Sequence, residues 1–241
     1  MKVLKALDIA KMIDHSLLNP TLTKDEVIAG CLTASKYNVA SVCVKPCDAA
    51  LAKTALEGSE VLTSTVIGFP HGGHLIEVKV FEAEAALRDG CAELDMVLNI
   101  GRLLARDFSY VKEDIRRVCE VAHGGGSIVK VIFENAYLTD EFIIAACKLS
   151  AEAGADFVKT STGYAKTGAT LHDLRIMRAN IPDHMLVKAA GGVRTLDAAL
   201  KVRAAGAARF GATATVAIME EAFLREKAGT LAAPDDSGGE L

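Results

Sequence analysis

The sequence predicts an α/β protein built as a single-domain (β/α)8 TIM barrel. Strand-like and helical segments alternate along the chain, which is typical of parallel β-α units. A glycine turn that ends a helix and enters a strand recurs between these units. The length of 241 residues fits one barrel, for which about 250 residues are typical. A doubly wound open sheet is the alternative, but no G-x-G-x-x-G motif follows the first strand.

The expected strands are short runs rich in Val, Ile, Leu and Ala. Seven of them are plain, and an eighth, IDHSL at 13–17, is expected before the first long helix. In chain order, the expected strands are 13–17, 40–44, 62–67, 93–98, 128–133, 155–160, 185–190 and 208–211.

Helices are expected between the strands. Segments 75–88 and 107–122 repeat apolar residues at helical spacing, so each should pack one face on the sheet. Thr23 and Glu26 form a capping-box pattern, which predicts a helix over 24–36.

The recurring turn places a glycine just after a helix, at Gly90, Gly154 and Gly206. Glycine tolerates the left-handed conformation that stops a helix. Thr170 and Thr195 stand where the next helices should have their N-caps.

No linker divides the chain, so residues 1–227 are expected to form one barrel domain. Residues 228–241 contain the run AAPDDSGGE, which has the composition of a loose tail.

Composition excludes several classes of protein. The net charge of −4, the pI of about 5.9 and the absence of Trp argue against nucleic-acid binding. No apolar run reaches the ~20 residues of a membrane span, and the N-terminus lacks the apolar region of a signal peptide. Six Cys occur without a C-x-x-C pair, which favours free thiols in a reducing compartment and hence a cytoplasmic protein.

Alternation along the strands aims charged side chains into the barrel, because the apolar face of each strand must pack on the helices. By this rule Asp95, Lys159 and Lys188 point inward. Lys130 and Glu134 also share the inward face of one strand and are expected to form an internal ion pair. A structural ion network explains all five without any chemistry, and this alternative stays open.

The two inward lysines favour Schiff-base chemistry. A lysine attacks a carbonyl only when uncharged, and its ordinary pKa is about 10.4. Lys188 would lower the pKa of Lys159 as a neighbouring cation, and Phe157 and Val158 would supply an apolar wall. An iminium on Lys159 stabilises an adjacent carbanion, and Asp95 is expected to relay the proton, directly or through a water.

Two glycine-containing loops are candidates for phosphate binding. GGVRT at 191–195 and FGAT at 210–213 follow the expected seventh and eighth strands and lead into helices. Backbone N–H groups at helix N-termini bind phosphate, and in barrels this site lies after strands 7 and 8. A plain tight turn explains the first loop equally well.

Other reactive side chains carry weaker signals. His71 and His74 have loose spacing and no third ligand nearby, whereas zinc needs three or four, so we expect a surface loop and no metal. Cys43 and Cys47 are expected to be packed thiols, with Cys43 placed to face the site from the end of its strand.

These motifs together resemble the deoxyribose-phosphate aldolases, a family of metal-free class I aldolases. The resemblance spans nearly the whole chain. Its most specific blocks are TVIGFP at 65–70, ELDMVLNIG at 93–101, FVKTSTG at 157–163 and KAAGGVRT at 188–195.

The resemblance implies a cytoplasmic barrel enzyme, a homodimer or larger, that uses no cofactor. It would cleave 2-deoxy-D-ribose 5-phosphate to D-glyceraldehyde 3-phosphate and acetaldehyde. It implies Lys159 as the Schiff-base lysine, Asp95 as the proton relay and Lys188 as the assisting lysine. The implied phosphate contacts are Gly163, Gly192, Val193, Arg194 and Gly211, and the implied substrate-lining residues are Asp14, Asn19 and Thr162.

The chain departs from its relatives at the last loop, where Gly-x-Ser-Ser is common. Here the loop reads GATA at 211–214, which keeps one hydroxyl at Thr213, retained as a candidate substrate contact, and loses the other. Lys166 could compensate by reaching the phosphate. Lys45 replaces a residue that is usually uncharged, and no role is assigned to it.

Two other functions stay open. A catalytically silent barrel would bind a phosphorylated metabolite through the two glycine-containing loops without a nucleophilic Lys159. A related Schiff-base aldolase would use a different aldehyde acceptor.

Overall fold

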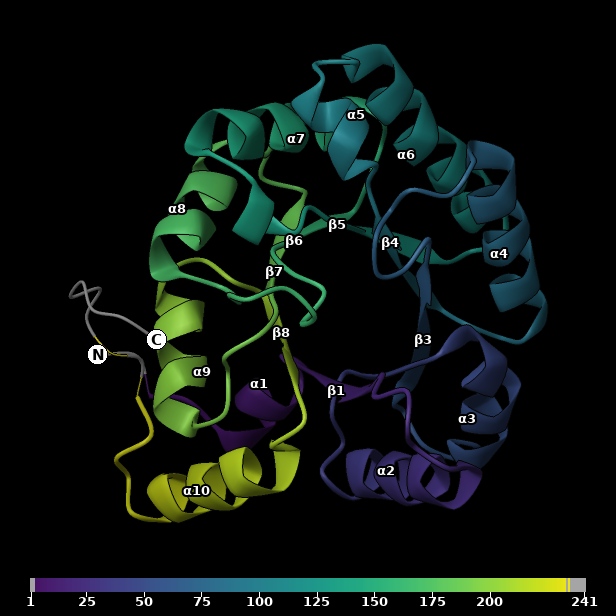
Figure 1. Ribbon diagram of the computed structural model, residues 1–241. Coiled ribbons are helices and arrows are strands. Elements are labelled where there is room, and N and C mark those ends of the chain that lie inside the picture. The colour runs from purple at the N-terminus through teal and green to yellow at the C-terminus, as the bar shows by residue number, and fades with distance from the viewer. Residues whose placement is uncertain (1–2, 233, 235–241) are drawn as a thin grey trace.

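The computed structural model describes residues 3–232 and 234, which form a closed barrel of parallel strands surrounded by helices (Figure 1). The strands follow chain order around the barrel, and β8 pairs with β1 to close it. Their bounds are β1 Ile13–Leu17, β2 Ser41–Val44, β3 Leu62–Ile67, β4 Glu93–Val97, β5 Ile128–Ile132, β6 Phe157–Lys159, β7 Leu186–Ala189 and β8 Arg209–Ala212.

Helices cover the outside of the barrel between successive strands (Figure 1). Their bounds are α1 Ala6–Ala10, α2 Lys24–Lys36, α3 Ala49–Ala55, α4 Ile76–Arg88, α5 Ile100–Leu104, α6 Phe108–Gly124, α7 Asp140–Glu152, α8 Leu171–Ala179, α9 Leu196–Ala204 and α10 Thr215–Lys227.

The barrel prediction is confirmed, and every expected strand appears at its place in the chain. The short helices α1 and α5 were not expected. At five residues each, they span little more than one turn of about 3.6 residues, so they offer no apolar periodicity to detect.

Helix ends follow the expected chemistry. Thr23 accepts a hydrogen bond from the Glu26 backbone N–H, and the Glu26 carboxylate accepts from Thr23 in return. Thr170 and Thr195 cap α8 and α9 in the same way through their hydroxyl groups. These caps fix where each helix leaves its loop, and therefore how the loops at the barrel mouth are held.

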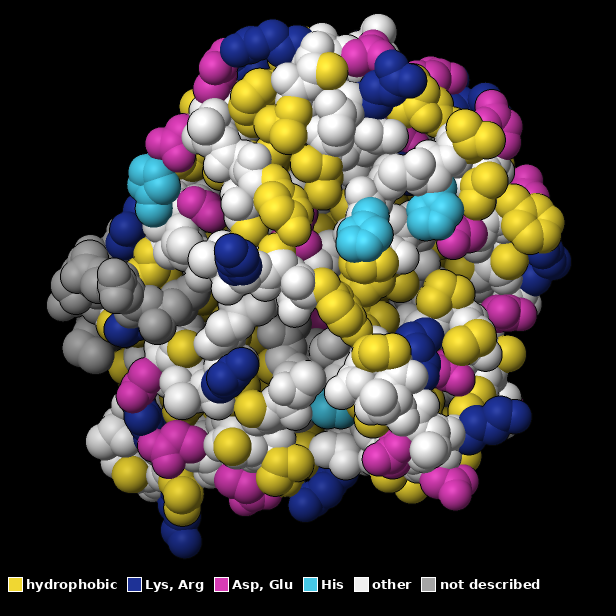
Figure 2. Space-filling model, in the orientation of Figure 1, with side chains coloured by type: hydrophobic (Ala, Val, Ile, Leu, Met, Phe, Trp, Pro, Cys, Tyr) yellow, Lys and Arg dark blue, Asp and Glu magenta, His cyan; other side chains and the backbone are white. Residues whose placement is uncertain are grey.

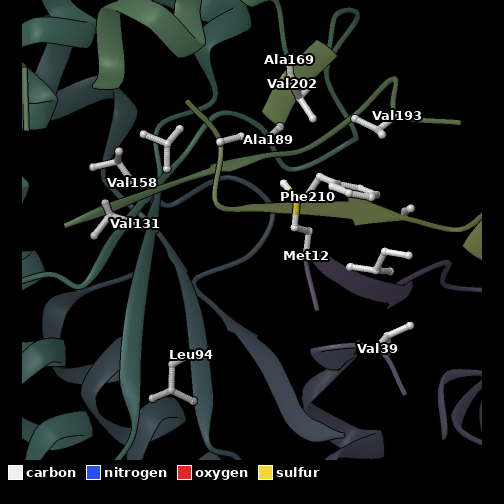
Figure 3. Packing of buried hydrophobic residues seen from close by; sticks show 14 of the residues in the cluster. Met12, Val39, Leu94, Val131, Val158, Ala169, Ala189, Val193, Val202 and Phe210 are labelled. Carbon is white, nitrogen blue, oxygen red and sulfur yellow. The ribbon is translucent and has the colours of Figure 1, made fainter. Parts of the chain in front are cut away.

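The core has two layers that the strand pleat separates. Leu94 of β4, Val131 of β5 and Val158 of β6 point outward and pack with the helices (Figure 3). Alternate residues such as Val97 and Phe157 are equally buried but lie outside that cluster, inside the barrel. The inside of the barrel therefore holds the charged residues that share this parity.

The C-terminal segment packs on the barrel further than expected. Leu231 is buried, and its carbonyl accepts a hydrogen bond from the Leu4 backbone N–H. Val3 and Ala232 form an antiparallel bridge. The loose tail was predicted from residue 228; Leu231 and Ala232 are held by these contacts, residues 228–230 are exposed, and 233 and 235–241 lie outside the described residues.

Candidate active site

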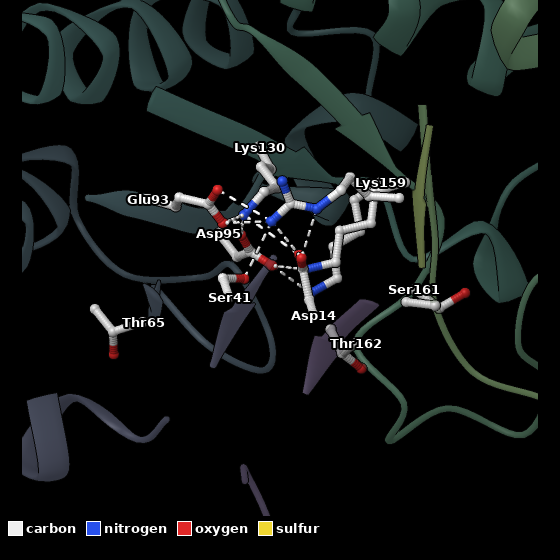
Figure 4. A network of polar contacts seen from close by, with 12 residues as sticks. Asp14, Ser41, Thr65, Glu93, Asp95, Lys130, Lys159, Ser161 and Thr162 are labelled. Carbon is white, nitrogen blue, oxygen red and sulfur yellow. Dashed lines mark hydrogen bonds and ion pairs between the residues drawn. The ribbon is translucent and has the colours of Figure 1, made fainter. Parts of the chain in front are cut away.

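Charged side chains from six strands meet inside the barrel (Figure 4). They form a continuous network of ion pairs, and the side chains of all but Arg209 are at most 4% exposed. The members are Asp14 of β1, Glu93 and Asp95 of β4, Lys130 of β5, Lys159 of β6, Lys188 of β7 and Arg209 of β8. We call this set the ionic network.

Asp95 stands at the centre of the ionic network. Its Oδ2 accepts from the Nζ of Lys159 at 2.8 Å and from the Nζ of Lys188 at 2.7 Å, while its Oδ1 accepts from Lys130 at 2.9 Å. Strand register explains the meeting, because Asp95 pairs with Lys130 across β4 and β5 and Lys159 pairs with Lys188 across β6 and β7. One carboxylate thus joins three amines.

Arg209 and Glu93 hold the rest of the ionic network. Arg209 donates from Nε to Asp14 Oδ1 at 2.7 Å and from Nη2 to both carboxylate oxygens of Glu93 at 3.1 Å. Lys188 pairs with the other oxygen of Asp14. These contacts fix the two carboxylates that flank the lysines.

The predicted ion pair between Lys130 and Glu134 is wrong. Lys130 instead pairs with Glu93 at 2.5 Å and with Asp95. Glu134 lies beyond the end of β5 in the left-handed conformation, with φ of 57°. Strand alternation does not apply to a residue in that conformation, and the Glu134 carboxylate bonds to Thr162 instead.

Charge balance in the ionic network singles out Lys159. With every group ionised, four cations would face three carboxylates in a site shielded from water. The excess is removed at least cost by one neutral amine. Lys159 pairs with one carboxylate, whereas Lys188 pairs with two and Lys130 with three, so Lys159 gives up its proton most readily.

The pKa shifts have the same direction. Burial lowers the pKa of Lys159, and the nearby Lys188 lowers it further against the pull of Asp95. Burial alone would lower the pKa of Lys188 and Lys130, but their carboxylate neighbours raise both above the ordinary value. Burial alone would raise the pKa of Asp95, but Lys130, Lys159 and Lys188 hold it well below its usual range.

The apolar wall beside Lys159 differs in part from the prediction. Phe157 is buried inside the barrel, on the same strand face as Lys159. Val158 points outward into the helix layer (Figure 3). Its alternate position on β6 requires this, so Val158 does not contribute to the wall.

A cavity of about 490 Å³ lies above the ionic network, at the carboxyl ends of the strands. Lys159 and Lys188 line it, whereas the fully buried Asp95 does not. Apart from Lys166, the other residues named from the sequence as substrate or phosphate contacts also line this cavity: Asp14, Asn19, Thr162, Gly163, Gly192, Val193, Arg194, Gly211 and Thr213.

The loops after β6, β7 and β8 form one wall of this cavity. Gly192 has φ of +94°, a conformation that other residues adopt only with strain. Thr160 ties the loops together, because its hydroxyl donates to the Ala190 carbonyl and accepts from the Ala190 N–H. The first turn of α10 has no side-chain cap, so its backbone N–H groups are available beside Thr213.

Arg209 and Tyr164 had no predicted role in the site, whereas Cys43 was expected to face it. Arg209 has the same strand parity as Gly211, and that parity could have placed it inside the barrel. Cys43 lines the cavity, as expected from its position at the end of β2. Tyr164 also lines it and donates a hydrogen bond to the Leu18 carbonyl at 2.8 Å.

Lys166 and Lys45, which the sequence singled out, lie outside the barrel interior. Lys166 is exposed and does not line the cavity. Lys45 forms an ion pair with Asp48 at 3.3 Å and donates to the Leu22 carbonyl.

Lys79 provides a contrast with Lys159. It is fully buried between α4 and β4, where it pairs with Asp114 and donates to the Val97 carbonyl at 2.9 Å. Burial lowers the pKa of Lys79 too, but Lys79 lines none of the cavities described for the molecule. Burial alone therefore does not distinguish the two lysines, and Lys159 differs from Lys79 in lining a substrate-sized cavity.

The face of the molecule in Figure 2 shows acidic and basic side chains interspersed around its rim. His71 and His74 are both exposed. Among the residues that the structure describes, no three His, Cys, Asp or Glu side chains converge as a metal site. In the same part of the chain, every helix is too short or too polar to cross a bilayer.

Comparison with known proteins decides the family. Residues 8–220 match the DeoC/LacD family aldolases. The chain belongs to this family. It is 52% identical over 218 residues to a deoxyribose-phosphate aldolase of Thermococcus gammatolerans, covering 90% of this chain and 97% of the relative. It is 50% identical over 215 residues to that of Rhodopirellula baltica, covering 89% of each.

A solved structure of the same family has the same fold. The deoxyribose phosphate aldolase of Aeropyrum pernix, described as a tetramer, superposes with a TM-score of 0.82 at 32% identity. The alignment covers 90% of this chain and 92% of that one. The family resemblance stated from the sequence blocks is therefore confirmed over most of the chain.

Proposed function

We propose that this protein is a class I aldolase that reversibly cleaves 2-deoxy-D-ribose 5-phosphate to D-glyceraldehyde 3-phosphate and acetaldehyde. Relatives that are about half identical over nearly the whole chain are deoxyribose-phosphate aldolases. The observation that carries the proposal is Lys159, a buried amine with a lowered pKa at the floor of a substrate-sized cavity.

In the proposed reaction the neutral Lys159 amine attacks the C1 aldehyde of the open-chain sugar. Loss of water gives an iminium, which acts as an electron sink. The C3 hydroxyl then loses its proton, the C2–C3 bond breaks, and glyceraldehyde 3-phosphate leaves with a new carbonyl at C3. Protonation of the remaining enamine at C2 and hydrolysis of the imine release acetaldehyde and restore Lys159.

Asp95 and Lys188 are proposed to move the proton. Asp95 is buried beneath the cavity, so it reaches a bound sugar through Lys188, which lines the cavity, or through a water. Lys188 and Lys159 bond to the same oxygen of Asp95, so protonation of one amine lowers the proton affinity of the other. Lys188 is thus proposed as the group nearest the C3 hydroxyl.

The phosphate is proposed to bind at the opposite end of the substrate, against the loops after β6, β7 and β8. The supporting features are the backbone N–H groups of Gly163, Gly192 and Val193, the side chain of Arg194 and the uncapped start of α10. Gly211 and Thr213 line the same wall, and Asp14, Asn19 and Thr162 are proposed to surround the sugar.

Borohydride trapping tests this function. Substrate plus borohydride should label Lys159 irreversibly, which peptide mass spectrometry would locate. Tight binding of phosphate esters without labelling would instead indicate a silent barrel. A preference for the phosphorylated sugar below about tenfold, or ~1.4 kcal/mol, would indicate an aldolase for a different acceptor.

Assembly and location are also proposals. We infer a homodimer or larger oligomer, because the Aeropyrum pernix relative is described as tetrameric. The cysteines are all free, five of them buried, which supports a cytoplasmic location. Light scattering of the purified protein and fractionation of its host cells test these two points.

A further inference from the structure

Glu134 occupies an unfavourable position for its residue type. It lies just after β5 with φ of 57° and ψ of 65°, a left-handed backbone conformation that residues with a Cβ rarely adopt. Its side chain is nevertheless buried, with the residue 2% exposed. In the described part of the chain no cation forms an ion pair with it. Strain and burial at one residue indicate that its carboxylate has a specific use.

Among residues 3–232 and 234, the side-chain hydrogen bonds of Glu134 all go to Thr162. The Thr162 backbone N–H lies 3.3 Å from each carboxylate oxygen, and the Thr162 hydroxyl bonds to Oε2. A carboxylate only accepts hydrogen bonds, so the hydroxyl of Thr162 must donate its single proton to Glu134. The same hydroxyl oxygen accepts from the Tyr164 backbone N–H at 3.0 Å.

This arrangement decides whether the Thr162 hydroxyl donates a hydrogen bond to a ligand or accepts one from it. The Thr162 hydroxyl has already donated its proton, and one lone pair is left on its oxygen. Thr162 follows Lys159 by three residues and lines the same cavity as Lys159 and the glycine-containing loops, where the phosphate is proposed to bind. A group bound beside it can therefore bond to Thr162 only as a hydrogen-bond donor. A sugar hydroxyl meets this requirement, whereas a carbonyl or phosphate oxygen does not.

We propose that Glu134 is a positioning residue that makes Thr162 an obligate acceptor and so selects substrates with a hydroxyl between the reacting carbonyl and the phosphate. The inference rests on the proposed function. Glu134 acts through Thr162 and does not line the main cavity itself. In the synthetic direction, the selected group is the 2-hydroxyl of glyceraldehyde 3-phosphate.

The test compares two acceptors in the condensation with acetaldehyde. One is glyceraldehyde 3-phosphate, and the other is 3-oxopropyl phosphate, the same aldehyde without its 2-hydroxyl. Glu134→Gln keeps the size of the side chain but replaces one acceptor oxygen with an amide N–H donor, so the Thr162 hydroxyl is no longer obliged to donate its proton. We expect the ratio of kcat/KM for the two acceptors to fall about tenfold, mostly through the hydroxylated acceptor.

Thr162 variants show whether the effect passes through its hydroxyl. Thr162→Val should lose the same preference, and adding Glu134→Gln to it should change the ratio no further. Thr162→Ser keeps the hydroxyl and should keep the preference, which covers the case where Glu134→Gln fails to fold. Thr63→Val is the matched control, because Thr63 is a buried threonine away from the cavity whose hydroxyl has no partner in the described part of the chain.

The outcomes separate a failure of the role of Glu134 from a failure of the proposed function. Equal losses with both acceptors, or a ratio that moves less than threefold, would overturn the selective role of Glu134 and leave it a structural residue. A wild-type protein that turns over neither acceptor and forms no trapped imine would refute the proposed function, and this inference with it. An active wild-type enzyme with an unchanged ratio would refute the inference alone.

Discussion

Removing the charge of Lys188 should raise the proton affinity of Lys159 and slow imine formation near neutral pH. The two amines bond to the same oxygen of Asp95, at 2.7 and 2.8 Å. Two such amines lie roughly 4–5 Å apart, so their repulsion is worth about 3–4 kcal/mol at an effective dielectric constant near 20. Part of this repulsion is offset by Asp95 itself.

We therefore expect Lys188→Met to lower the rate of imine formation at pH 7 by roughly 10- to 100-fold, at about 1.4 kcal/mol per factor of ten. The fold should survive, because Asp14 keeps Arg209 and Asp95 keeps Lys130 and Lys159 as partners. The assay is single-turnover trapping with acetaldehyde and borohydride between pH 5 and 10, read by mass spectrometry.

The shape of the pH profile decides this prediction. The rate of the variant should keep rising with pH beyond the point where the wild type levels off, and approach the wild-type rate in alkali. Lys166→Met removes an exposed lysine from the barrel mouth and should leave the profile unchanged. An equal loss of rate at every pH would mean that Lys188 acts through its contacts in the site and not through its charge. An unchanged profile would refute the argument that the charge of Lys188 lowers the pKa of Lys159.

Three further predictions follow from the same geometry. Lys159→Met should abolish turnover without lowering Tm, because it leaves three cations facing three carboxylates; calorimetry showing a fall of more than about 5 °C, roughly 1–2 kcal/mol, would mean that Lys159 is a charged structural partner. Asp95→Asn should destabilise the fold by about 3–5 kcal/mol, because buried lysines lose their shared carboxylate, yet trapped imine should persist while C–C cleavage is lost; equal loss of both steps would reject the relay. Gly192→Ala should raise KM for 2-deoxyribose 5-phosphate about tenfold, since a Cβ at φ of +94° costs roughly 1–2 kcal/mol, and should spare the unphosphorylated sugar. Gly58→Ala carries similar backbone strain in open space away from the cavity and should leave both KM values unchanged; a parallel rise for the two sugars in Gly192→Ala would argue against phosphate binding at this loop.

Strand alternation explains why so much of the site could be predicted from the sequence. The pleat has a fixed period of two, so the apolar residues of β4 alone aim Asp95 into the barrel. The same rule aims Lys159 and Lys188 inward from neighbouring strands, and the strand register shows that they lie at one level. Arg209 obeys the rule too, because it shares the parity of Gly211 on β8.

The rule fails where the strand ends. Glu134 follows β5 in the left-handed conformation, so its side chain meets Thr162 rather than Lys130. The left-handed conformation is recognised in a sequence mainly by glycine, so a glutamate at that position gives no signal for it. The charge balance of the ionic network was also beyond the sequence, because it depends on which carboxylate each amine reaches across the barrel.

The central claim is that Lys159 is a neutral amine within the ionic network at physiological pH. NMR titration of lysine side-chain nitrogens, assigned with Lys159→Met, measures its protonation state directly. We predict that Lys159 is uncharged near neutral pH while the amines of Lys130 and Lys188 remain protonated. A Lys159 signal that stays that of an ammonium up to about pH 10, its ordinary range, would contradict the account.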